Sequence, residues 1–167
     1  MENPSILLHP NIPKPLHGMS PRTVSGKEWW DVQRKQAYAA AEYHCEACGI
    51  CKEGAAFHQW LEAHELYRFN YSKGRMTFVR LVALCHSCHN YIHSGRLQIL
   101  AQTGQISREK YETIIHHGNE ILKRNKLKRP KSPRHVAKWA AWRLVIDGKK
   151  YPGKFQSRED WEQFYSR

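Results

Sequence analysis

Two cysteine pairs restrict this chain to a narrow class of folds. The pairs have C-x2-C spacing and are separated by residues 49–84: Cys45 and Cys48, then Cys85 and Cys88. Zinc closes a structural site with four ligands in a tetrahedron, and each C-x2-C turn provides two of them. The pairs therefore predict one structural zinc site. Cys51 lies shortly after the first pair; it could replace a ligand, although a spare thiol is the simpler interpretation.

Two histidines follow the second cysteine pair directly. His89 and His93 are spaced i and i+4, so on a helix they project from the same face and can share one cation. A zinc-bound turn before them would fix the start of that helix. Their natural third partner is His64, which lies in the segment 61–66 that we expect to be a strand. The three imidazoles predict a second metal site, separate from the cysteines.

The cysteine pairs also indicate the compartment. The N-terminus lacks the charged and apolar segments of a signal peptide, and no apolar run approaches the roughly 18 residues of a membrane span. In a reducing environment, paired cysteines are metal ligands rather than disulfides. We therefore expect a cytoplasmic protein that makes no contact with a membrane.

The net charge predicts a polyanionic partner. The chain carries a formal charge of +12, and residues 121–150 contain eleven lysines and arginines but one acid, Asp147. Basic clusters bind phosphate backbones because each contact releases counterions. The alternative is a basic protein without such a partner. The residues expected to bind nucleic acid are Lys123, Arg124, Lys126, Lys128, Arg129, Lys131, Arg134 and Lys138.

The order of segments predicts four consecutive parts. Prolines in residues 1–24 favour an extended arm. Residues 25–126 form the zinc-containing domain with flanking helices, the first beginning at a capping box of Ser25 and Glu28. Residues 127–135 are a basic linker, and residues 136–167 form a small aromatic-rich unit of a hairpin and a helix.

After its first helix, the zinc-containing domain is predicted to contain two strands and three further helices. The strands are 61–66 and 78–84, with residues 67–75 as the loop between them. A helix then runs from Cys88 to near Gly95, a short helix ends at Gly104, and Ser107 caps a longer helix. His116 and His117 lie on or beside the apolar face of that last helix and are expected to be surface or packing residues.

The motifs EAHEL and LVALCHSCHNYIH resemble the HNH endonuclease family, in its zinc-bearing subtype. The similar stretch is residues 43–96, about a third of the chain. The resemblance implies an α+β fold, in which a ββα-metal core of a hairpin and a helix surrounds one catalytic divalent ion. His64, His89 and His93 match the ion's ligands. Free-standing nucleases of this family often belong to phage or mobile elements.

The resemblance also implies an activity. In such enzymes a divalent ion (Mg²⁺, Mn²⁺, Ni²⁺ or Zn²⁺) binds the scissile phosphate while a nearby base activates water. DNA is the expected substrate, and RNA and a protein partner are the alternatives.

Two positions depart from the family pattern. Glu65 stands where the general-base histidine is usual, and Arg80 stands where an asparagine orients that base. Glu65 can act as the base if Arg80 holds its carboxylate. Another register makes His64 the base and Glu62 or Glu65 the strand ligand. A third interpretation is an HNH-like module that no longer cleaves and instead binds nucleic acid or a protein, as an inhibitor or accessory factor.

Overall fold

The structure is a computed structural model that describes residues 2–166. It is a mixed α+β fold, as expected from the sequence, with five α-helices and a four-stranded sheet in the described part of the chain. None of the helices in that part combines the length and the apolar composition that a membrane crossing requires. The helices are α1 (Pro21–Ala40), α2 (His86–Ile92), α3 (Ser94–Gln102), α4 (Arg108–Arg124) and α5 (Arg158–Tyr165).

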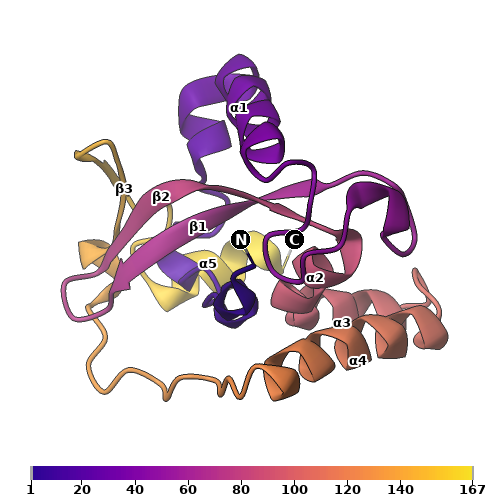
Figure 1. Cartoon of the computed structure of the whole chain (residues 1–167). Helices are drawn as coiled ribbons and strands as arrows, with labels where there is room; N and C mark the ends of the chain where they lie inside the picture. Colours follow the sequence, from indigo (N-terminus) through magenta and orange to yellow (C-terminus); the bar gives the residue numbers. More distant parts are fainter. Residues whose placement is uncertain (1, 167) are drawn as a thin grey trace. The chain divides into compact units, whose positions relative to one another are not determined.

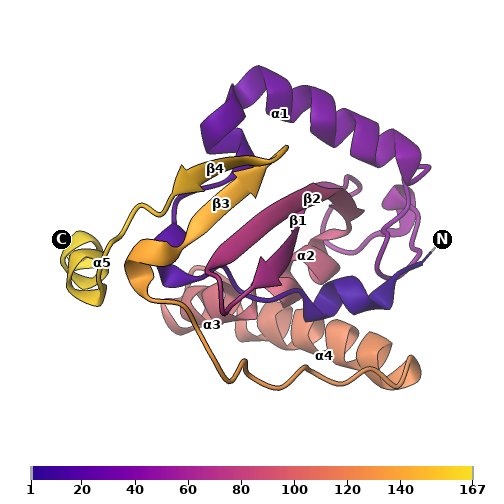
Figure 2. The ribbon, with the colours of Figure 1, turned by 90° about the vertical axis from the view of Figure 1, so that its left-hand side faces the viewer.

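The sheet has the order β1-β2-β3-β4, and its strands are β1 (Glu62–Asn70), β2 (Arg75–Leu84), β3 (Arg143–Ile146) and β4 (Lys149–Pro152). The first two strands form a long hairpin that leads directly into α2 (Figure 1). β3 pairs with β2 in parallel, and β4 returns antiparallel to β3 (Figure 2). The turn between β3 and β4 is Asp147-Gly148, within the segment where the sequence predicted a hairpin.

The hairpin is longer than the sequence predicted. Residues expected to form its loop, 67–75, instead extend both strands and leave a short turn at residues 71–74. Tyr67 and Phe69 favour a strand, and Tyr67 is buried in an apolar cluster, which explains the extension. Gly74 closes the turn with a φ of 60°.

The chain forms two compact units, each built from segments that are distant in sequence. The first contains Met1–Asn11, Arg34–His64 and Leu81–Pro130; the second contains Ile12–Gln33, Glu65–Arg80 and Lys131–Arg167. Each unit is discontinuous in sequence, and the base of the β1–β2 hairpin belongs to the first unit and its tip to the second.

The core of the first unit forms between α2, α3, α4 and a 3₁₀ turn at Pro4–Leu8. Ile6 and Leu7 of that turn are almost fully buried. The N-terminal arm is therefore not extended throughout: proline is tolerated in the first turn of a helix, and the apolar residues that follow gain by burial. On α4, Gly118 allows the ring of Tyr91 to pack directly against the helix backbone.

The second unit is organised around an apolar cluster on the sheet. Its buried members are Leu16, Tyr67, Met76, Trp142, Leu144 and Ile146. The aromatic C-terminal segment thus packs through β3 and the preceding Trp142. Ser157 caps α5, because its Oγ accepts a hydrogen bond from the amide of Asp160.

The start of α1 differs from the predicted capping box. The helix begins at Pro21, where Ser20 and Thr23 cap it through reciprocal hydrogen bonds of 3.2 and 2.9 Å between side chains and amides. Gly26 then interrupts the helical backbone with a φ of 87°. Two helical segments therefore meet at Gly26, and the Ser25 and Glu28 pair flanks this break rather than the first residue of α1.

The end of α3 and the start of α4 agree with those predicted from the sequence, whereas α2 ends earlier than predicted. The amide of Lys110 donates to Oγ of Ser107, which confirms the cap of α4, and Gly104 after α3 has a φ of 71°. The helix expected to run through His93 to Gly95 ends earlier. His93 has a φ of −89° and a ψ of 33°, and it serves as the junction between α2 and α3.

Candidate metal centre

The four cysteines converge at one end of α2. Their sulfur atoms all lie within 4.8 Å of one another, and the Sγ atoms of Cys48 and Cys85 are 3.9 Å apart. A tetrahedron with Zn–S bonds of about 2.3 Å has edges of about 3.8 Å. Three of the four residues are buried: Cys45, Cys85 and Cys88. The predicted proximity is confirmed, and the cluster can hold a zinc ion.

The first cysteine turn is shaped by its backbone. The amide of Gly49 donates to the carbonyl of Cys45, and the amide of Cys45 donates to the carbonyl of Ile50, both at 2.8 Å. Gly49 has a φ of 74°, and a Cβ at this position would overlap the side chain of Glu2. Glycine is therefore favoured here by its backbone conformation, whereas the Glu2 side chain can move aside.

The second pair belongs to α2. Cys85 is the N-cap residue, and Cys88 lies in the first turn. The neighbouring sulfurs of Cys45 and Cys48, together with burial, raise the pKa of the Cys88 thiol. Four such groups cannot ionise together without a cation to balance their charge, so the arrangement suits zinc rather than free thiols.

His117 approaches the cysteine cluster from α4. Its Nε2 lies 3.4 Å from Sγ of Cys88, where an imidazole N–H can donate to a thiolate. The sequence had suggested a surface or packing residue, and the spacing of α4 alone did not distinguish His117 from His116. Cys51 points elsewhere: its thiol donates to a carboxylate oxygen of Glu53 at 2.7 Å. This contact favours the simpler interpretation, in which Cys51 is a spare thiol and not a zinc ligand.

The three predicted histidines also converge. His64 comes from β1, whereas His89 and His93 come from the end of α2, and one ligand nitrogen of each lies within 4.8 Å of the others. The ring centroids of His64 and His93 are 5.0 Å apart, and those of His89 and His93 are 4.9 Å apart. We call these residues the histidine trio.

The protonation and burial of the trio fit a cation. His64 is 3% exposed, and its Nδ1 has no hydrogen-bond partner within residues 2–166. An unpaired buried nitrogen is costly unless a ligand satisfies it. Burial lowers the pKa of His64 to about 2 and that of His93 to about 4. Both imidazoles are therefore neutral at physiological pH, which is the form that binds metals.

Two further residues orient the trio. Nε2 of His64 lies 3.3 Å from Nδ1 of His9, and Nδ1 of His89 hydrogen-bonds to Oε2 of Glu62. Such outer contacts fix which ring nitrogen carries the proton. Glu62 and His64 alternate with one residue between them on β1, so their side chains leave the same face of the strand.

A third convergent group lies beside the trio. It contains His58, Glu62 and His86, and its three ligand atoms also lie within 4.8 Å of one another. Burial raises the pKa of Glu62, but hydrogen bonds from His89 and His86 outweigh burial and bring the pKa to about 2. The carboxylate is therefore ionised. The sequence pattern missed His58 and His86, although His86, His89 and His93 have the spacing of one helical stripe.

Glu65 and Arg80 lie on the paired strands β1 and β2. Adjacent residues of a strand point to opposite faces, so Glu65 leaves β1 on the face opposite His64. Among residues 2–166, the three groups of potential metal ligands do not include Glu65. Its role as a general base, with Arg80 as its positioning residue, stays a prediction.

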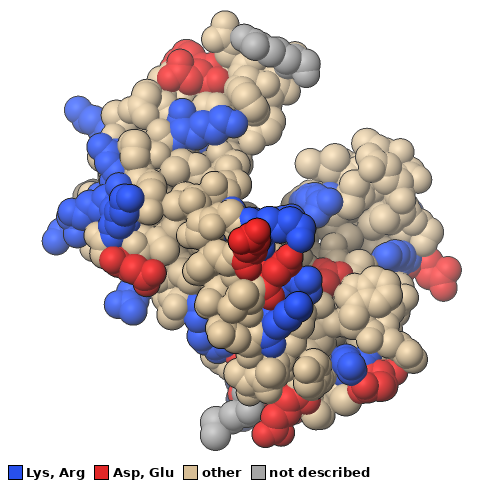
Figure 3. All heavy atoms as spheres, turned by 90° about the horizontal axis from the view of Figure 1, so that it is seen from above, with Lys and Arg blue, Asp and Glu red and all other residues tan. Residues whose placement is uncertain are grey.

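The residues predicted to bind nucleic acid are all exposed. They occupy the last turn of α4 and the irregular segment that follows it: Lys123, Arg124, Lys126, Lys128, Arg129, Lys131, Arg134 and Lys138. Arg129 also lies over the ring of Tyr91, 5.7 Å from its centroid. Lysine and arginine side chains are visible in several places on the face shown in Figure 3, with acidic side chains between them.

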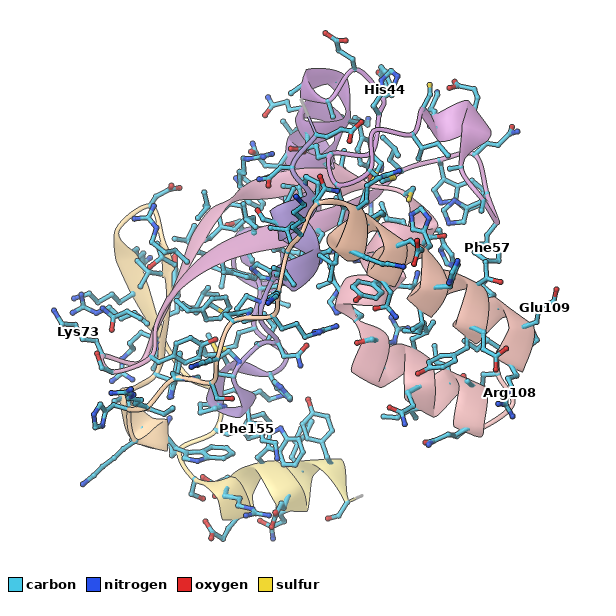
Figure 4. All side chains as sticks on the ribbon, turned by 60° about the horizontal axis from the view of Figure 1, so that its bottom comes forward. His44, Phe57, Lys73, Arg108, Glu109 and Phe155 are labelled. Carbon is cyan, nitrogen blue, oxygen red and sulfur yellow. The ribbon has the colours of Figure 1, made fainter. Side chains whose placement is uncertain are left out.

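Aromatic side chains flank the third group. The ring of His58 stacks on Trp60 with centroids 3.7 Å apart, and Trp60 is 61% exposed. Phe57 meets His86 edge to face at 5.4 Å, and Nζ of Lys110 lies 4.8 Å over the Phe57 ring. In Figure 4, Phe57 lies on the loop before β1, on the same side as the first residues of α4. These contacts hold both imidazoles in place.

Comparison of the chain with protein-family models, curated proteins and solved structures finds no match.

Proposed function

We propose that this chain is a metal-dependent endonuclease of the HNH type that hydrolyses phosphodiester bonds in DNA. In this proposal β1, β2 and α2 form the ββα-metal core, and the four cysteines hold a structural zinc ion. The observation that carries the proposal is the histidine trio: three imidazoles converge beside the cysteine cluster, and Nδ1 of His64 is buried without a hydrogen-bond partner within residues 2–166.

Each residue around the trio has a defined part in the proposed reaction. A bound divalent cation supplies Lewis-acid stabilisation of the charge that develops on the phosphate. His64, His89 and His93 hold that cation. His9 and Glu62 orient two of these imidazoles, so that the ligand nitrogens face the cation without rotating.

Two assignments of the general base follow from the resemblance and the strand geometry. The resemblance assigns the base to Glu65, with Arg80 holding its carboxylate. The alternative register makes His64 the base and leaves Glu62 or Glu65 as the strand ligand of the cation; Glu62 shares a face of β1 with His64. These assignments predict different effects of substituting Glu62 and Glu65, which are compared below.

The exposed basic residues at and after the end of α4 are proposed to hold the phosphate backbone. Their side chains are solvent-accessible, and Arg124 also lines a hollow on α4. Contacts of this kind bind any sequence and weaken as salt concentration rises. Binding of a DNA duplex should therefore fall steeply between low and moderate salt.

The test is cleavage of supercoiled plasmid and of labelled oligonucleotides with Mg²⁺, Mn²⁺, Ni²⁺ or Zn²⁺. His89→Ala and His64→Ala should lower the rate at least about 100-fold, since each removes a cation ligand. His135→Ala is the matched control, because His135 is exposed and lies outside the three ligand groups. Equal rates for the wild type and all variants would mean that the cleavage is a contaminant.

A second function is favoured by the residues at the two departing positions. Glu65 and Arg80 replace the histidine and asparagine of the family pattern. An HNH-like module without hydrolysis would bind nucleic acid or a protein through the same fold. In that case the wild type would form a stable complex without cleaving, and the complex would survive His64→Ala and His89→Ala.

A further inference from the structure

We infer that His58, Glu62 and His86 form a second cation site next to the histidine trio, so that the centre holds two divalent transition-metal cations connected by Glu62. The role of the second cation in phosphodiester hydrolysis rests on the proposed function. Binding of the cation does not, because it can be measured without any cleavage. We call these three residues the Glu62 site.

The spacing of the three ligand atoms matches a coordination polyhedron. Oε1 of Glu62 lies 2.7 Å from Nδ1 of His86 and 2.9 Å from Nε2 of His58, and the two nitrogens are 3.0 Å apart. An octahedron with bonds of about 2.1 Å has edges of about 3.0 Å, and a tetrahedron with bonds of about 2.0 Å has edges of about 3.3 Å. The atoms therefore occupy one face of such a polyhedron.

Hydrogen bonds alone do not satisfy this triangle. If both imidazoles donate to Oε1 of Glu62, the contact between Nε2 of His58 and Nδ1 of His86 brings two N–H groups together without an acceptor. If His58 donates to His86 instead, the unprotonated nitrogen of His86 faces the carboxylate and the two lone pairs repel. At least one of the three short contacts is unsatisfied in either arrangement. One cation inside the triangle satisfies all three.

The donor set also suits a transition metal. Two imidazoles and one carboxylate on one face leave the opposite positions open to water or phosphate, and first-row divalent ions accept this combination. The three side chains are 12–23% exposed, so the site is sheltered yet open to solvent. The side-chain amide of Asn90, 3.2 Å from Nδ1 of His86, is a further polar neighbour.

Glu62 connects the two sites through its two oxygens. Oε1 faces His58 and His86, whereas Oε2 accepts the hydrogen bond from Nδ1 of His89. That bond leaves the other nitrogen of His89 for the cation of the trio. The two cations would therefore share no ligand atom, and they would be linked through the Glu62 carboxylate and the His89 imidazole.

The test counts cobalt bound to the full-length chain that carries zinc in its cysteine site. Equilibrium dialysis against Co²⁺ should give about two bound cobalt ions for the wild type. His58→Ala and His93→Ala should each remove one, since they affect different sites, and His135→Ala should remove none. Zinc content and circular dichroism check the fold, and His86→Ala replaces His58→Ala if that variant fails to fold.

The decisive quantity is the difference in bound cobalt between the wild type and His58→Ala. A difference of one supports the Glu62 site, and a difference of zero overturns it. The result is independent of the nuclease proposal. Two bound cobalt ions without cleavage would support the second site and reject the nuclease proposal. Cleavage together with an unchanged cobalt count in His58→Ala would support the nuclease proposal and reject the second site.

Discussion

Nδ1 of His89 donates a hydrogen bond to Oε2 of Glu62, which joins the helix that carries two predicted cation ligands to the strand that carries the third. This bond selects the tautomer of His89, because a nitrogen that donates its proton cannot also bind a cation. The carboxylate is held in turn by His58 and His86. Glu62 therefore connects His58 and His86 to the histidine trio and fixes the orientation of His89.

The first prediction separates Glu62 from Glu65. Glu62→Gln should weaken Co²⁺ binding at both sites, since it removes a proposed ligand of the Glu62 site and the partner that orients His89. At the histidine trio the expected loss of affinity is about 10- to 100-fold. Glu65→Gln should leave Co²⁺ affinity unchanged and, if Glu65 is the general base, lower the cleavage rate about 100-fold or more. Isothermal titration with Co²⁺ and single-turnover cleavage measure the two effects. Equal losses of cation affinity in both variants would contradict the distinction.

The second prediction concerns the cysteine cluster. Cys88→Ser should abolish stoichiometric zinc and cooperative unfolding of the first unit, because structural zinc sites contribute binding free energy directly to folding. Cys51→Ser should keep one zinc ion per chain, since Cys51 contacts Glu53 rather than the cluster. Metal analysis and thermal unfolding provide the measurements. Retention of zinc in Cys88→Ser would show that this residue is not a ligand.

The convergence of the four cysteines was predictable from their spacing alone, because two C-x2-C pairs are typical of one four-ligand structural zinc site. The structure brings the four sulfurs within 4.8 Å of one another. The proximity of His64 to His89 and His93 was also predicted, first as a natural third partner of the two helix histidines and then from the resemblance. His89 and His93 share a helix face, whereas only the fold brings a strand residue beside them.

The residues that sequence reasoning missed depend on contacts between distant segments. His58 lies in an irregular loop with no periodicity, and its position is set by stacking on Trp60 and by the Glu62 carboxylate. The sequence alone did not show which of His116 and His117 lies near the cysteines. The packing of α4 against α2 places His117 beside Cys88. The length of the hairpin was underestimated for a similar reason, since Tyr67 becomes a strand residue by burial in a cluster formed with later segments.

The third prediction tests the packing that supports α2. Gly118→Ala should destabilise the chain by about 1–3 kcal/mol or more, because the new methyl group would overlap the ring of Tyr91. Gly95→Ala is the matched control. Nothing lies within 4 Å of a Cβ at that helical position, so alanine should stabilise it by up to about 1 kcal/mol. Urea unfolding measures both changes, and a neutral Gly118→Ala would contradict this packing.

The fourth prediction concerns pH. Burial lowers the pKa of His64 to about 2 and that of His93 to about 4 in the folded chain, whereas an unfolded histidine titrates near 6.5. As pH falls below about 6.5, the unfolded state therefore takes up protons that the folded state does not bind. The free energy of unfolding should fall through this window, down to about pH 4 for His93 and about pH 2 for His64.

The magnitude of this effect is bounded by linkage. His64 alone contributes a slope of at most about 1.4 kcal/mol per pH unit. Urea unfolding of the zinc-loaded chain at pH 7.5, 6.5 and 5.5, without other divalent ions, gives the slope. His64→Gln should have a shallower slope, since it lacks the titrating imidazole, while zinc loss at low pH affects both proteins alike. Identical slopes would mean that His64 is not held neutral by burial, and the argument for a cation at its unpaired nitrogen would fail with it.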